Sequence, residues 1–91
     1  MASKRTARSA VGVSWSESQI RQHSAGALRY AIKAAGATQA DAAKWCQVSE
    51  RTIRDWLNGQ APINLRAVLR SGRLRRNFIR YLRVCDLKEA A

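Results

Sequence analysis

Hydrophobic residues recur at helical spacing along most of the chain, and no alternating run of apolar and polar residues is long enough for a strand. Helical segments are predicted to begin after Ser16, Thr38, Ser49 and Asn64, which are residue types that cap helix N-termini. A fifth segment follows Gly72. The pattern therefore predicts an all-α fold, a compact bundle of about five short helices.

The first predicted helix leaves one question open. Ser16 followed by Gln19 forms a capping box, and Gly36 is placed to end the helix in a left-handed conformation. Gly26 weakens the middle of this segment, and Ser24 could cap a second helix. Residues 16–35 are thus compatible with one helix or with two.

Residues 38–59 are predicted to form two short helices joined by a tight turn. Thr38 with Asp41 caps the first helix, Ser49 caps the second, and Gly59 follows the end of the second. Ala43 lacks bulk, so another helix can cross it closely. The second helix would carry residue types that can contact base edges or phosphates, namely Glu50, Arg51, Thr52, Arg54, Asp55 and Asn58.

The two ends of the chain differ from the middle. Residues 1–12 lack periodicity and are basic, which predicts a disordered arm that either remains solvated or contacts DNA through Lys4, Arg5 and Arg8. Residues 13–86 form the predicted domain, and residues 87–91 a frayed tail. The last helix carries an apolar stripe that is either core or dimer interface, made of Phe78, Tyr81, Leu82 and Cys85.

The charge of the chain favours a polyanionic partner. Seventeen Lys and Arg against six Asp and Glu give a formal net charge of +11. Seven arginines and no acidic residue lie between Arg66 and Arg83, which indicates either a solvated basic face or a nucleic-acid contact. Arg66 and Arg70 come soon after the two-helix segment and are the best candidates for contacts with backbone phosphates. Arg76, Arg80 and Arg83 lie further from it and could instead line a dimer interface.

Several classes of function are disfavoured. Cys46 and Cys85 lie on predicted apolar faces without neighbouring ligand residues, so we expect buried free thiols rather than a metal site. No nucleophile with an adjacent base and no glycine-rich phosphate loop occurs, so we expect neither an enzyme nor a cofactor or small-molecule ligand. The absence of a long apolar run argues against a membrane partner, and we expect a cytoplasmic protein.

The two-helix segment resembles the helix-turn-helix of the phage-repressor and Cro family. The matching residues are T-Q at 38–39, A-A at 42–43, V-S at 48–49 and R-T-I-R-D-W-L-N-G at 51–59. The resemblance covers about residues 25–69. One position departs from the family pattern, because Gln47 stands where a glycine is usual in the turn.

The resemblance implies a helix-turn-helix at 38–59 whose second helix, about 50–58, enters the major groove. It implies base contacts by Glu50, Arg51, Arg54 and Asp55. Phosphate contacts are implied for Gln39, Ser49, Thr52 and Asn58, with Arg66 and Arg70 added from the charge pattern.

The expected function is a sequence-specific regulator of transcription that binds double-stranded DNA. A small phage or prophage repressor that binds a pseudo-palindromic operator as a homodimer fits best, because one monomer recognises only a few base pairs. Two alternatives remain from the sequence. One is a DNA-binding antitoxin or accessory protein with a protein partner, and the other is a non-specific nucleic-acid-binding protein.

Overall fold

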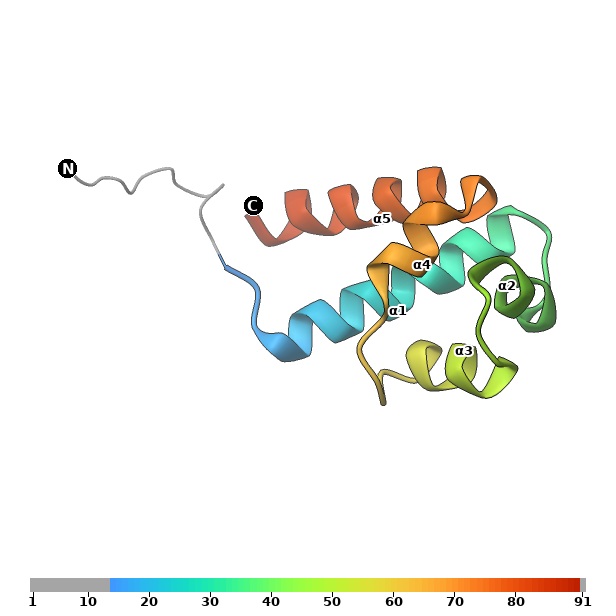
Figure 1. Cartoon of the computed structure of the whole chain (residues 1–91). Helices are drawn as coiled ribbons and strands as arrows, with labels where there is room; N and C mark the ends of the chain where they lie inside the picture. Colours follow the sequence, from blue (N-terminus) through green and yellow to red (C-terminus); the bar gives the residue numbers. More distant parts are fainter. Residues whose placement is uncertain (1–13, 91) are drawn as a thin grey trace.

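The computed structural model describes residues 14–90 and contains, within that range, five helices and no strand. The helices are α1 (Glu17–Ala34), α2 (Gln39–Cys46), α3 (Glu50–Leu57), α4 (Leu65–Arg70) and α5 (Gly72–Ala90), as Figure 1 shows. The prediction of an all-α bundle is confirmed. The expected arm with Lys4, Arg5 and Arg8 lies outside the described residues.

Side-chain caps set the starts of the first four helices, at the residues predicted. The Ser16 hydroxyl accepts from the Gln19 backbone N–H at 3.1 Å, and the Ser16 N–H donates to Gln19 Oε1 at 2.8 Å. Thr38 and Asp41 form the same reciprocal pair, with both distances 3.1 Å. The side chains of Ser49 and Asn64 each accept one backbone N–H of the helix that follows. Helix starts are therefore determined locally, by residues within one turn.

The first segment is one continuous helix, α1, and it packs antiparallel against α5. Gly26 lies where α1 meets Tyr81 of α5, and a Cβ atom at Gly26 would come within 2.8 Å of Tyr81 Oη. Glycine in the middle of α1 thus allows close packing of the tyrosine ring and does not mark a break between two helices.

Gly26→Ala is expected to destabilise the protein by about 1 kcal/mol, because the clash with Tyr81 outweighs the gain in helix propensity. In a Tyr81→Ala background the same change should instead stabilise by up to about 1 kcal/mol. Urea unfolding of the four proteins in this double-mutant cycle measures both values. Equal effects of Gly26→Ala in the two backgrounds would show that the contact does not matter.

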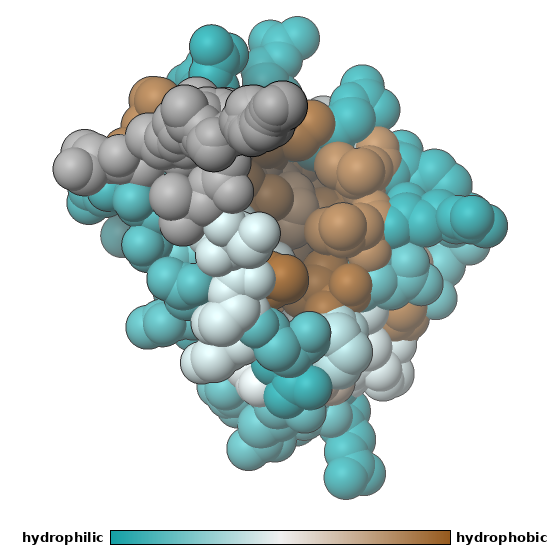
Figure 2. Space-filling model, turned by 90° about the vertical axis from the view of Figure 1, so that its left-hand side faces the viewer, coloured by the Kyte–Doolittle hydropathy of each residue, from teal (hydrophilic) through white to brown (hydrophobic). Residues whose placement is uncertain are grey.

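The far end of α5 is held by contacts with the start of α1. Glu89 Oε2 lies 3.0 Å from His23 Nε2, and Glu89 Oε1 accepts from Gln19 Nε2 at 3.4 Å. The Trp15 ring lies against His23, with 4.6 Å between ring centroids. Residues 87–90, expected as a frayed tail, are helical because these contacts give the end of α5 a tertiary partner. Apolar side chains also reach the surface at this end of the molecule (Figure 2).

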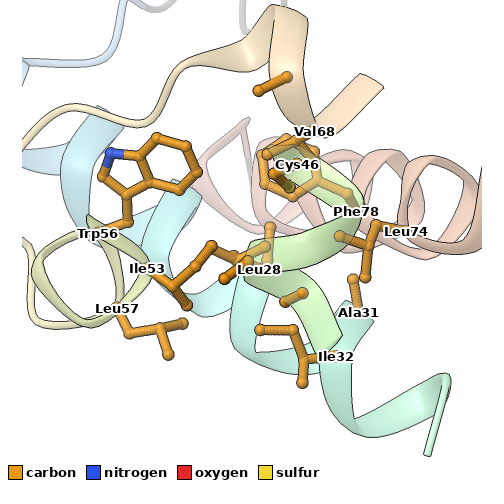
Figure 3. Packing of buried hydrophobic residues seen from close by; sticks show 14 residues of the cluster. Leu28, Ala31, Ile32, Cys46, Ile53, Trp56, Leu57, Val68, Leu74 and Phe78 are labelled. Atoms are coloured by element: carbon orange, nitrogen blue, oxygen red, sulfur yellow. The ribbon is translucent and has the colours of Figure 1, made fainter. Parts of the chain in front are cut away.

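The core lies where all five helices meet. Its largest fully buried side chains are those of Leu28, Ile53, Val68, Leu74 and Phe78 (Figure 3). Cys46 and Cys85 are buried free cysteines, as expected from their apolar surroundings in the sequence. Burial raises the pKa of both thiols, and for Cys46 the positive charge of Arg70 offsets part of that rise.

The apolar stripe of the last helix, for which the sequence left core and dimer interface open, is mostly internal. Phe78 is 1% exposed and Cys85 8% exposed, while Tyr81 and Leu82 are half-buried against the core. Phe78 and Cys85 are therefore core residues, which is one of the two roles that the sequence left open for the stripe.

Candidate nucleic-acid interface

Helices α2 and α3 are joined by a short turn whose first residue has a left-handed backbone. Gln47 has φ 59° and is the one non-glycine residue with positive φ among residues 14–90. The Val48 N–H donates to the Ala43 carbonyl at 3.0 Å, which closes the end of α2. We refer to residues 39–57 as the α2–turn–α3 unit. The backbone adopts at Gln47 the conformation for which a glycine would be better suited.

Gln47→Gly is expected to stabilise the protein by about 0.5–1 kcal/mol, because it relieves the left-handed strain of a residue with a Cβ atom. The gain is reduced by loss of one exposed hydrogen bond, which Arg70 Nη2 donates to Gln47 Oε1 at 3.1 Å. Thermal unfolding measures the net effect. A destabilised Gln47→Gly protein would show that the Arg70 contact is worth more than the strain.

Helix α3 has one face in the core and one in solvent. Ile53, Trp56 and Leu57 are buried, and this face packs against α1 and α2. The opposite face carries Glu50, Arg51, Arg54 and Asn58, which are exposed, and Asp55, which is half-buried. The residues predicted to contact DNA bases thus share one accessible face, at steps of three and four residues.

Some polar side chains at α3 have a hydrogen-bond partner within the protein, and others form no ion pair. The Ser49 hydroxyl caps the helix and lies 2.9 Å from the Thr52 hydroxyl, so each of these two residues has a partner within the protein. Glu50, Arg51, Arg54 and Asp55 form no ion pair with any residue in 14–90. No ion pair with Asp55 therefore orients Arg51 or Arg54.

Helix α1 supports the end of α3 through Arg29, a role that the sequence did not suggest. Arg29 Nη2 donates to the Leu57 carbonyl at 2.8 Å, which satisfies a terminal carbonyl of α3 and places a cation at the negative end of the helix. This contact depends on the crossing of two helices that are distant in sequence.

Two shallow grooves flank the end of α3, one on each side of Arg29. The larger, about 750 Å³, runs along α1 to Asn58 and includes the side chains of Arg21 and Gln22. The smaller, about 270 Å³, brings Gln39 beside Lys33. Gln39 lies in the first turn of α2 and is exposed, as the predicted phosphate contact requires.

The arginines after the α2–turn–α3 unit do not form one surface. Arg70 reaches the turn at Gln47, and Arg66 is exposed in the first turn of α4. Arg73 lies over the ring of Trp45, 5.1 Å from its centroid, and Arg75 donates to the Leu69 carbonyl at 3.2 Å. The remaining arginines belong to α5, which is separated from α3 by α1 (Figure 1): Arg76, Arg80 and Arg83.

Among residues 14–90, no helix is long and apolar enough to cross a membrane.

Comparisons with known proteins assign no function to the α2–turn–α3 unit. No protein-family model matches the chain, and no significant match was found among curated proteins or solved structures.

Proposed function

We propose that the protein binds double-stranded DNA sequence-specifically and regulates transcription, as a small repressor that acts as a homodimer. The observation that carries the proposal is the two-sided character of α3. Its buried face fixes the helix in the fold. Its outer face presents the exposed Asn58 together with Arg51 and Arg54, which form no ion pair within residues 14–90. Eight residues make a helix about 12 Å long, which suits insertion into a major groove about 12 Å wide.

Groups on both sides of α3 can hold the DNA backbone. Gln39 and Lys33 border one groove, and Arg70 lies at the turn that precedes α3. Arg21 and Gln22 border the groove on the other side, near Asn58. Contacts of this kind with phosphates would fix the position of α3 on the duplex, and the side chains on its outer face would then select the sequence.

The proposal is tested by selecting bound duplexes from random DNA with the full chain. Enrichment of one motif with two inverted half-sites about one helical turn apart is the expected result. Recovery of unrelated sequences, with random DNA displacing the protein as well as any selected site, would contradict specific recognition. That outcome would favour non-specific binding through the net charge of +11.

Arg70→Ala is expected to weaken binding to all DNA sequences by a similar factor. Arg70 lies at the turn before α3 and carries one of the charges that would neutralise a phosphate. Its loss should reduce the slope of log affinity against log salt by about 0.9. Titrations of a selected site and of random DNA at several salt concentrations measure both quantities. A loss confined to the selected site would instead give Arg70 a part in base recognition.

A further inference from the structure

An apolar groove lies between the start of α1 and the second half of α5, away from the α2–turn–α3 unit. It has a volume of about 620 Å³ and is lined by Trp15, Ile20, Ile79, Leu82, Arg83 and Asp86. Ile20 is 43% exposed and Ile79 49% exposed, and Leu87, one turn beyond Arg83, is 63% exposed. Figure 2 views the molecule from this end and shows the apolar surface there. We call these six lining residues the α1–α5 groove.

The charges of the α1–α5 groove distinguish it from the rest of the surface. The chain carries a formal net charge of +11, yet the groove pairs one cation, Arg83, with one anion, Asp86. Both side chains are exposed, and neither forms an ion pair with another residue of the described range. Because the charges of Arg83 and Asp86 cancel, the groove favours neither a strongly acidic nor a strongly basic partner. It suits a surface that carries the same two charges in reverse order.

We propose that the α1–α5 groove binds a second copy of this chain, with two α5 helices packed antiparallel about a twofold axis. In such an isologous contact each residue pair occurs twice. The register that brings Arg83 to Asp86 of the second copy also brings Leu82 opposite Leu87 of the second copy. Two copies of the groove are therefore complementary in charge and also make apolar contact with each other. This inference rests on the proposed function in one respect: dimerisation through the groove matters for DNA binding only if the protein binds DNA as proposed.

The test uses sedimentation of the full chain without DNA. Arg83→Asp places two acids opposite each other in a homodimer, and Asp86→Arg places two arginines opposite each other. Each variant alone is expected to self-associate at least about tenfold more weakly than the wild type. An equimolar mixture of the two variants should form heterodimers with wild-type affinity, because both ion pairs are then restored across the interface.

The mixture distinguishes an interface between copies from a role within one chain, since a residue that acts only in its own helix cannot be rescued by another molecule. Helical content, measured by circular dichroism, should be unchanged in both variants. A wild type that stays monomeric at all concentrations, or a mixture that associates no better than either variant, would overturn the proposal. Because DNA is absent, self-association can be confirmed even if the proposed sequence-specific binding fails, and the reverse also holds.

Discussion

Phe78→Ala is expected to destabilise the protein by about 3–5 kcal/mol, a large part of the total stability of a domain of this size. Phe78 is 1% exposed and belongs to the cluster that joins α5 to α1 and α4. Its removal leaves a cavity between helices that cannot close without shifting α5. For a chain of this length each kcal/mol corresponds to about 4–8 °C in Tm, so thermal unfolding followed by circular dichroism measures the effect.

Ile79→Ala is the matched control, because Ile79 is the next residue in the same helix and is 49% exposed. It should change the free energy of unfolding by only about 0.5 kcal/mol. Both proteins are compared at a concentration low enough to exclude self-association, in which Ile79 has a proposed part. Similar losses for the two variants would show that α5 does not bury the face seen in this structure.

The helix starts were predictable because caps act over a single turn. Ser16, Thr38, Ser49 and Asn64 each bond to the backbone N–H three residues on, so the sequence carries the whole interaction. The exposed side of α3 was predictable for a related reason. Its buried residues follow the helical period, which leaves the polar residues on the other side.

The features of the fold that the sequence did not predict all depend on contacts between helices that are distant in sequence. Position 26 requires a glycine because the Tyr81 ring packs against it. The helical conformation at the end of α5 depends on the contacts of Glu89 with His23 and Gln19. An apolar stripe such as that of Phe78 shows that a helix face is covered, but not whether its own chain or a second copy covers it. The period alone does not contain that information.

The placement of the arginines changes how binding energy is expected to be distributed. The sequence suggested that the whole run from Arg66 to Arg83 could hold DNA. In the fold, Arg73 and Arg75 have internal partners, and the other arginines of α5 lie across α1 from α3. If α3 enters the major groove, the cations beside it come from two helices: Arg21 and Lys33 belong to α1, and Arg70 belongs to α4. Backbone contacts would then surround α3.

Arg51→Ala is expected to reduce discrimination between the best site and a site with one changed base pair by about 1–3 kcal/mol. Arg51 is exposed in the first turn of α3 and has no ion-pair partner among residues 14–90, so its guanidinium is free to bond guanine O6 and N7. The loss should fall on one position of each half-site. Competition binding with single-base variants of the selected duplex measures it position by position.

Arg76→Ala is the matched control for charge, since Arg76 is also exposed but lies on α5, across α1 from α3. It removes the same charge from the chain and should leave discrimination unchanged at every position. Both substitutions should alter stability by less than about 0.5 kcal/mol, so differences in folding cannot account for the contrast. Equal, uniform losses for the two variants would mean that Arg51 contributes charge alone, and α3 would then not be the helix that reads the sequence.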